Sequence, residues 1–202
     1  MSGSSNDKIN FMAGSPLNRL SWLRSSTRFI NAASLSTSTR WLLYRSGDPL
    51  VYKLSGRPVE LPTKSVEKLL GPTPYFGQGQ QIGETATTEN DEKRLASARI
   101  RGPTAVFLGV WEGKGGDDAF TTIVSTAVKG DVYFALDVST VEKEVLDSVQ
   151  LLASTEEGES EVLYAPARIA SRRFNKQQAA IFASAKAIME WNARIKVPYY
   201  RP

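Results

Sequence analysis

The sequence contains neither cysteine nor histidine in its 202 residues. The absence of cysteine excludes disulfides, a thiolate nucleophile, and zinc or iron–sulfur sites built on cysteine. The absence of histidine removes the commonest general base at neutral pH and the commonest ligand of transition metals. Any chemistry in this chain therefore has to rest on carboxylates, lysines, tyrosines or hard metal ions.

Long hydrophobic runs are also missing, since no apolar stretch approaches the roughly 18 residues of a membrane-spanning helix. We therefore expect no membrane partner. The composition that is present, 41% apolar and 23% charged residues, is typical of a folded domain with a hydrophobic core. The net charge of +4 permits weak attraction to nucleic acid without requiring it.

The N-terminal part of the chain is poor in acidic residues. Residues 1–10 are polar and predicted to be disordered. Residues 8–47 contain arginines, serines and threonines but no acidic residue, a composition that mitochondrial transit peptides share. We favour a folded segment, because the stretch 15–24 begins with Ser-Pro, which resembles a helix N-cap and first turn. Its three leucines also share one helical face.

The rest of the chain predicts strands and helices in mixed order. The apolar segments 41–44 and 50–52, joined by the turn residues 46–49, predict a β-hairpin. Further strands are expected at 104–111, 131–138 and 162–164, helices at 63–70 and 139–152, and loops at 71–91, 113–118 and 155–160. Because strands and helices do not alternate strictly, we predict an α+β fold with a mixed or antiparallel sheet and packed helices.

A long helix is predicted near the C-terminus, over residues 177–194. Apolar side chains form one stripe along it, with Asn192 among them: Phe174, Ile181, Ala185, Ile188, Asn192 and Ile195, flanked by Phe182 and Met189. Lys186 and Glu190 are spaced for an i,i+4 ion pair of a few tenths of a kcal/mol. Trp191 lies at the edge of the stripe, where it serves either the core or an interface.

Several stretches imitate functional motifs. The glycines of 77–83 and 109–116 do not have the spacing of a dinucleotide or phosphate loop, so we interpret them as a loop and a hairpin turn. The acidic stretch 156–161 is interpreted as solvated charge. Arg168, Arg172 and Arg173 are interpreted as surface residues, because no nucleic-acid motif accompanies them. The residues alone therefore predict no catalytic, cofactor-binding or metal-binding residue.

Three parts of the sequence together resemble a known family. They are FMAGSPLNRLSWLR (11–24), LLGPTPYFGQGQ (69–80) with SARIRGPTAVFLGV (97–110), and AAIFASAKAIMEWNARIK (179–196). In this order they are similar to the N-terminal region of fungal NADH pyrophosphatases, the NAD(H) diphosphatase branch of the Nudix hydrolases. The resemblance implies that residues 11–196 form the N-terminal domain of such a protein, ending in a long helix.

In that family the helix leads into a zinc ribbon and then into a catalytic Nudix domain, which uses magnesium or manganese to hydrolyse NAD(H) to NMN(H) and AMP. Residues 197–202 (VPYYRP) stand where the first zinc-binding cysteines are expected, and the Arg-Glu dipeptide of the Nudix box occurs nowhere in the sequence. We therefore expect no cofactor in this chain and no NADH hydrolysis by it alone. We expect NAD(H) to bind only to a catalytic domain outside these residues.

Members of the family are commonly homodimers to which this domain contributes, so the resemblance implies a homodimer or a partner protein. The candidate interface residues are Trp191, Tyr199, Tyr200 and Arg201, since tyrosine, tryptophan and arginine are enriched at interfaces. Two alternatives stay open: a stand-alone protein-binding or self-association module, and a weak nucleic-acid binder using the basic N-terminal third, which is ranked last. The expected compartment is the cytoplasm, with the peroxisome or mitochondrion as alternatives.

Overall fold

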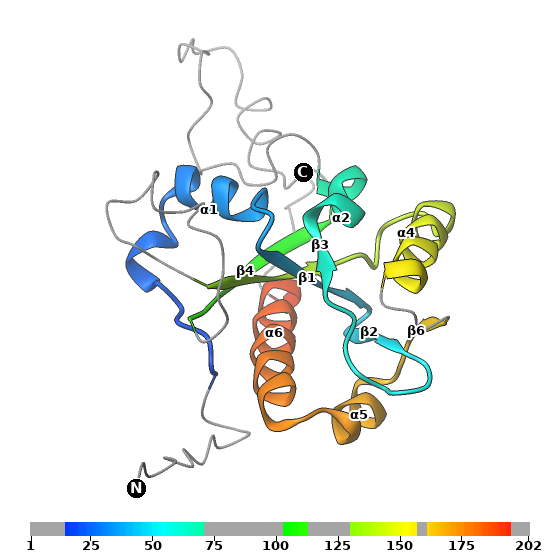
Figure 1. The fold of residues 1–202 in the computed structure, drawn as a ribbon. Coiled ribbons are helices and arrows are strands. Elements are labelled where there is room, and N and C mark those ends of the chain that lie inside the picture. Colours follow the sequence, from blue (N-terminus) through cyan, green and yellow to red (C-terminus); the bar gives the residue numbers. More distant parts are fainter. Residues whose placement is uncertain (1–14, 71–102, 113–129, 157–160, 195–202) are drawn as a thin grey trace, which may run out of the picture.

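In the computed structural model, which describes residues 15–70, 103–112, 130–156 and 161–194, a six-stranded mixed sheet is covered by helices on both faces (Figure 1). The strands are β1 (Thr39–Arg45), β2 (Asp48–Tyr52), β3 (Leu61–Pro62), β4 (Thr104–Trp111), β5 (Asp131–Asp137) and β6 (Val162–Tyr164). The helices are α1 (Thr27–Ser34), α2 (Thr63–Leu70), α4 (Lys143–Glu156), α5 (Ala167–Ala170) and α6 (Lys176–Arg194), with 3-10 turns η1 (Ser21–Leu23) and η3 (Ser171–Arg173). The predicted α+β class is confirmed.

The sheet is mixed because its two central strands are parallel. The strand order is β4-β5-β1-β2-β6, and β3 pairs with β1 as well. Strands β1 and β5 run parallel, in a register from Thr39 opposite Val132 to Tyr44 opposite Asp137, whereas every other pairing in the described sheet is antiparallel. Parallel strands need a long connection and cover on both faces, so the helices have to divide between the two sides.

Side chains along β1 alternate between two hydrophobic clusters. Trp41 and Leu43 join the cluster that includes α1, α2 and α4, and the Trp41 ring stacks on Phe134 with 4.6 Å between centroids. Leu42 and Tyr44 join the cluster formed with α6 on the opposite face. Each large apolar side chain buried in this way contributes about 1.5–3 kcal/mol of transfer free energy. Both faces of β1 are therefore core.

Helix α6 is the long helix predicted from the sequence. It begins at Lys176, where Asn175 Oδ1 accepts from the Gln178 N–H at 2.9 Å and Gln178 Oε1 accepts from the Asn175 N–H at 3.1 Å, a reciprocal cap. Its buried residues are Ala179, Ala180, Ile181, Phe182, Ala185 and Met189. The predicted apolar stripe is confirmed at Ile181, Phe182, Ala185 and Met189. Phe174 and Ile188 are partly buried against the same cluster, and Ile195 lies outside the described residues. In the described ranges, no helix combines the length and the apolar character that crossing a membrane requires.

Most other predicted elements are confirmed with small shifts of their ends. The hairpin, α2, β4, β5 and β6 lie where the sequence predicts them. Helix α4 begins at Lys143, four residues later than predicted, and runs on to Glu156 into the predicted acidic loop. The predicted disorder of residues 1–10, the loops 71–91 and 113–118, and the remainder of the acidic stretch at 157–160 lie outside the described residues.

The helix predicted for residues 15–24 is wrong. Asn18 pairs with Val110 on the edge of β4 through two backbone hydrogen bonds of 2.8 and 2.9 Å, and Leu20 has a left-handed φ of 44°. Only the short turn η1 follows. The helix of this region is instead α1, capped by Ser26, whose Oγ accepts from the Phe29 N–H at 3.3 Å. The backbone of this segment forms hydrogen bonds with the edge of the sheet at Asn18. The leucine spacing therefore reflects the burial of leucine side chains and does not indicate a helix.

Gly109 allows this edge pairing. It follows a bulge in the β4–β5 register and has a φ of 149°, which side chains rarely tolerate. A methyl group there would lie 2.6 Å from the carbonyl oxygen of Asn18. Gly109, the first glycine of the 109–116 stretch, is therefore required by the backbone geometry of β4 and by its contact with Asn18.

Replacing this glycine tests the edge pairing. We expect Gly109→Ala to lower the free energy of unfolding by about 2 kcal/mol or more, because both the backbone conformation and the contact with Asn18 disfavour a Cβ. Urea denaturation followed by circular dichroism measures the change. Glu112→Ala, which removes only the exposed 2.6 Å hydrogen bond from Asn18 Nδ2, is the control and should cost about 1 kcal/mol at most. Equal effects of the two variants would contradict this explanation.

Candidate functional site

The candidate interface centres on the C-terminal end of α6. Trp191 lies in its last turns with 61% of its surface exposed, so it belongs to the molecular surface in this structure. The other three candidates, Tyr199, Tyr200 and Arg201, lie outside the described residues. The described part of the candidate interface therefore consists of Trp191 and the residues around it.

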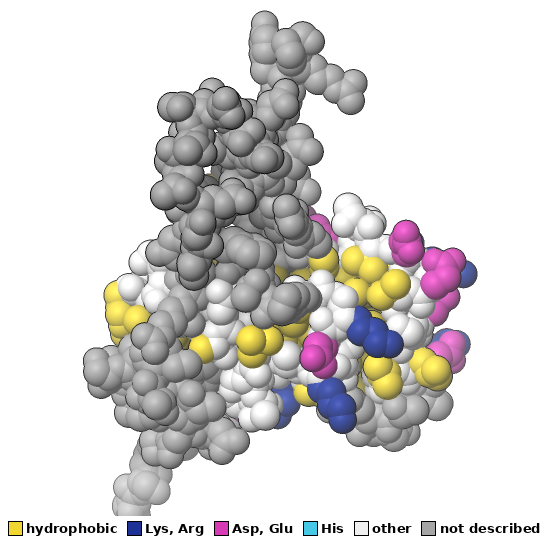
Figure 2. Space-filling view, turned by 90° about the horizontal axis from the view of Figure 1, so that it is seen from above, with side chains coloured by type: hydrophobic (Ala, Val, Ile, Leu, Met, Phe, Trp, Pro, Cys, Tyr) yellow, Lys and Arg dark blue, Asp and Glu magenta, His cyan; other side chains and the backbone are white. Residues whose placement is uncertain are grey.

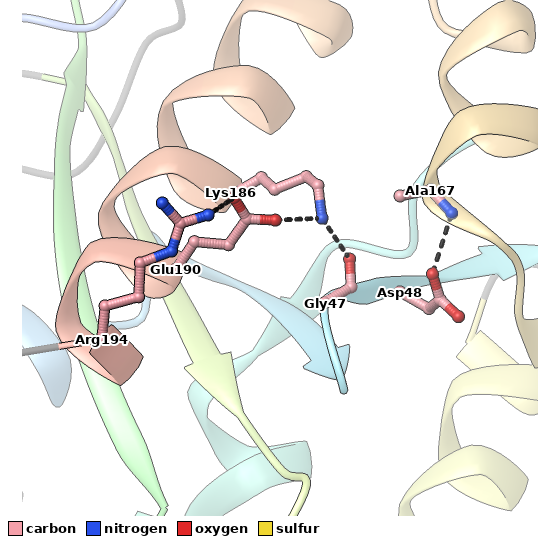
Figure 3. Close-up of polar contacts among 6 residues, drawn as sticks. All are labelled: Gly47, Asp48, Ala167, Lys186, Glu190 and Arg194. Carbon is pink, nitrogen blue, oxygen red and sulfur yellow. Dashed lines mark hydrogen bonds and ion pairs between the residues drawn. The ribbon is translucent and has the colours of Figure 1, made fainter. Parts of the chain in front are cut away.

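Two ion pairs lie along the C-terminal half of α6, the part of the helix that also carries Trp191 (Figure 3 draws the ion pairs). Lys186 Nζ is 2.7 Å from Glu190 Oε1, which confirms the predicted pair, and Arg194 Nη2 is 3.8 Å from Glu190 Oε2. The hydrogen bond and positive charge of Lys186 lower the pKa of Glu190. Because the carboxylate side chain is 44% exposed, solvent screens the pair, and its contribution is a few tenths of a kcal/mol.

The same lysine connects α6 to the hairpin turn between β1 and β2. Lys186 Nζ donates to the Gly47 carbonyl at 3.5 Å, and the turn continues into Asp48, whose Oδ1 accepts from the Ala167 N–H at 2.9 Å (Figure 3). The turn requires left-handed backbone at Ser46 and Gly47, with φ of 53° and 83°. The hairpin turn thereby contacts both α5 and α6, and α6 itself packs on the sheet through its buried residues Ile181, Phe182 and Ala185.

A shallow hollow lies between the end of α6 and the sheet, next to this site. It is lined by Thr104, Asp137, Met189, Asn192 and Ala193, and its cavity volume is about 10 Å³. Sites for drug-sized ligands measure about 300–1,000 Å³, so this hollow does not accommodate a dinucleotide.

The described carboxylates do not form a metal centre. No three acidic side chains come together at metal-binding distance in the described part of the chain. Asp137, which lines the hollow, accepts hydrogen bonds from the backbone N–H of Ser139 at 3.0 Å and from its hydroxyl. These two contacts fix the turn that follows β5.

Two buried tyrosines, Tyr44 and Tyr133, and the partly buried Tyr164 have raised pKa values. Burial raises the pKa of Tyr164 to about 12, and burial also raises the pKa of Tyr44. For Tyr133 burial is the largest cause, with the charge of Glu60 adding to the increase. Tyr133 donates to Glu60 Oε2 at 3.1 Å. All three hydroxyls stay protonated near pH 7 and serve packing or hydrogen bonding.

The arginines considered in the sequence separate into two groups. Arg24 is structural, because its Nη2 donates to the Leu108 carbonyl at 3.1 Å and its guanidinium lies 5.4 Å from the centre of the Phe107 ring. Arg168, Arg172 and Arg173 are exposed on α5 and η3, close to the start of α6 at Lys176. Sequence reasoning did not group Lys176 with these arginines. The signal that connects them is the absence of acidic residues between Glu161 and Glu190.

Comparison with known proteins identifies the family. The sequence pattern of the family described as "NADH pyrophosphatase-like rudimentary NUDIX domain" matches residues 38–191, which is most of the chain. The chain belongs to this family. The matched range includes all six strands of the described sheet and α6 as far as Trp191. The resemblance recognised from the three sequence stretches is confirmed.

A curated relative points to the same group of proteins. The NAD-capped RNA hydrolase NPY1 of Saccharomyces cerevisiae is 26% identical over 195 residues. The alignment covers 93% of this chain and 45% of that protein. The chain therefore spans less than half of the length of this relative, whose name describes hydrolysis of NAD-capped RNA.

The ion pair beside Trp191 predicts a pH-dependent coupling. Because the pKa of Glu190 is lowered in the folded state, the ion pair stabilises the folded protein fully at pH values above the ordinary glutamate pKa of about 4.3. Its contribution is lost as the pH falls through the lowered value. In a double-mutant cycle of Lys186→Met and Glu190→Gln, we expect a coupling energy of about 0.3 kcal/mol at pH 7 that disappears near pH 2. Urea denaturation at the two pH values measures it.

The control cycle combines Lys176→Met with Glu190→Gln, two residues at opposite ends of α6. Their effects should add at both pH values, because the side chains are too distant to interact. A coupling between Lys186 and Glu190 that stayed unchanged in acid would contradict the assignment of the pKa shift to Lys186.

Proposed function

We propose that this chain is the non-catalytic docking domain of an NADH pyrophosphatase-like protein, and that it holds two protomers together. The catalytic step belongs to a metal-dependent Nudix domain outside these residues. Likeness to the yeast relative suggests NAD(H) or an NAD-capped RNA as the substrate of the complete protein. In this assignment the rudimentary Nudix domain supplies the scaffold that positions the catalytic domains.

The observation that carries the proposal is the exposed Trp191 on a fixed helix. A tryptophan surrounded by polar and charged groups has the composition of an interface hot spot, where a large ring is buried and a polar rim excludes water. Glu190, Asn192 and Arg194 supply polar neighbours in the sequence around it. In a symmetric dimer the same surface of both protomers forms the interface. Each interface therefore contains Trp191 twice, once from each protomer.

Three further observations support a non-catalytic role. The Arg-Glu dipeptide of the Nudix box is missing from the sequence, and the hollow beside α6 is smaller than a dinucleotide requires. The described tyrosines with resolved pKa shifts stay protonated at neutral pH. The role that these features favour is assembly.

Self-association is the first test of this function. We expect the purified chain to be dimeric at about 50 µM, with a dissociation constant of about 1 µM or lower. Trp191→Ala should weaken the dimer about 30-fold or more, since loss of a hot-spot tryptophan costs about 2 kcal/mol or more. Sedimentation velocity over a concentration series measures both constants.

Trp22→Ala is the matched control, because Trp22 is 63% exposed on η1 and differs from Trp191 mainly in position. It should leave the dissociation constant unchanged within about twofold. A wild-type chain that remained monomeric at this concentration would contradict the dimerising role. So would equal weakening by the two tryptophan substitutions.

Activity is the second test. The chain, incubated with NADH and manganese, should release no AMP above the level of a protein-free control, because catalysis is assigned to a separate domain. Chromatographic quantification of AMP and NMNH measures this outcome. Turnover at an enzyme-like rate, on the order of 1 per second or faster, would contradict the non-catalytic assignment.

A further inference from the structure

We propose that the basic surface formed by α5, η3 and the first turn of α6 binds the phosphate backbone of single-stranded RNA. The choice of RNA as the polyanion rests on the proposed function, through the name of the yeast relative. The surface itself is defined by four side chains: Arg168, Arg172, Arg173 and Lys176. The sequence alone indicated that these arginines are surface residues without a nucleic-acid motif, and it placed the last-ranked nucleic-acid alternative on the basic N-terminal third.

The four cations form a local excess of positive charge. They fall within nine residues of sequence, in a stretch that contains no acidic residue between Glu161 and Glu190. All four are exposed. None of the four makes an ion pair with another described residue, whereas Lys53, Lys186 and Arg194 each have a carboxylate within 4 Å. Their charges are therefore available to an external anion.

The fold holds this surface in shape. Helix α5 and η3 follow each other directly, and Figure 1 shows α5 beside the end of α6 at which that helix begins. The stem of Arg173 packs over Gly56 in the segment after β2, so closely that a Cβ at Gly56 would lie 2.3 Å from Arg173 Cδ. Asp48 caps the start of α5 by accepting from the Ala167 N–H at 2.9 Å. The arginine stem is thus seated before any ligand arrives.

The dipole of α6 adds to the positive electrostatic potential at this surface and lowers the stability of the protein without a ligand. The N-terminus of a long helix carries a partial positive charge, which acidic residues in the first turn usually offset. Helix α6 has 19 residues, has no acidic residue in its first turn, and begins at Lys176 with Arg172 and Arg173 just before it. Like charges gathered at this end destabilise the free protein, and a bound phosphate would relieve the repulsion.

The rest of the surface supports a directed interaction. Figure 2 shows from above that acidic and basic side chains lie side by side on the right of the molecule. The exposed side chains of α2, of α4 and of the residue before α4 carry both signs: Glu67, Glu142, Glu144 and Asp147 with Lys64, Lys68 and Lys143. Helix α4 packs on the opposite face of the sheet from α6. A polyanion therefore meets mixed charges on the side of α2 and α4, and an excess of positive charge on the surface formed by α5, η3 and the start of α6.

A lipid surface fits the same side chains less well. A helix that lies on a membrane presents a broad apolar face beneath its basic residues. In residues 167–176 the exposed large aliphatic side chain is Ile169, and Phe174 is partly buried in the core. One aliphatic side chain is not such a face, so the observations favour the phosphates of RNA.

The test is binding of a fluorescent, uncapped oligouridylate of about 12 nucleotides, a length within the usual site size, followed by anisotropy at several salt concentrations. The triple variant Arg168→Gln, Arg172→Gln and Lys176→Gln should bind at least tenfold more weakly at low salt. The slope of log K against log salt should fall by about 2, because three contacts to single-stranded phosphates are lost.

The control is Lys64→Gln, Lys68→Gln and Lys143→Gln, three exposed lysines on α2 and α4 that change the net charge equally. It should retain binding within about twofold, since these residues lie on the other face. Equal weakening by both triple variants would overturn the proposal. So would binding to vesicles containing phosphatidylserine without binding to the RNA.

A single substitution separates binding from folding. Lys176→Glu places an acidic residue in the first turn of α6, so the thermal midpoint should rise while the affinity for RNA falls. A purely structural role for Lys176 predicts a lower midpoint and would overturn the proposal.

Because the RNA carries no NAD cap, the result does not depend on catalysis. Trp191→Ala should bind this RNA like the wild type, so failure of the dimer and failure of this surface are distinguishable.

Discussion

Strands β1 and β5 lie side by side and parallel in the centre of the sheet, through six registered residue pairs from Thr39 to Tyr44. Their side chains are buried on both faces, so the sheet is stable only when helices cover both. Helices α1, α2 and α4 cover one face, and α6 covers the other through Ile181, Phe182 and Ala185. The position of α6, and therefore of both its ends, follows from this central pairing.

Helix α6 places two different surfaces at its two ends. A helix of 19 residues is roughly 28 Å long, so the ends are separated by more than the reach of any side chain. The C-terminal end carries Trp191 beside the Lys186–Glu190 pair, and the N-terminal end adjoins the basic residues of α5 and η3. Packing along the middle of the helix fixes their separation. A protomer contact at one end therefore need not interfere with an anion at the other.

The sequence predicted the elements whose signals are local. Turn residues at 46–49 between apolar segments indicated the hairpin, and the stripe on α6 indicated its buried face. The helix predicted over 15–24 failed because Asn18 pairs with Val110, a contact across more than ninety residues that no local pattern encodes. The parallel register of β1 with β5 was inaccessible for the same reason. At the candidate site, the Lys186–Glu190 pair was predicted from spacing, whereas the contact of Lys186 with Gly47 needed the fold.

The central claim is that the domain associates through the C-terminal end of α6. Because the sequence contains no cysteine, a thiol introduced by Gln177→Cys takes up a spin label at that position alone. Pulsed electron paramagnetic resonance then measures the distance between the labels of two protomers. The account predicts one defined distance, which disappears when Trp191→Ala is added. A dipolar signal that Trp191→Ala leaves unchanged, or the absence of any such signal in the wild-type background, would contradict it.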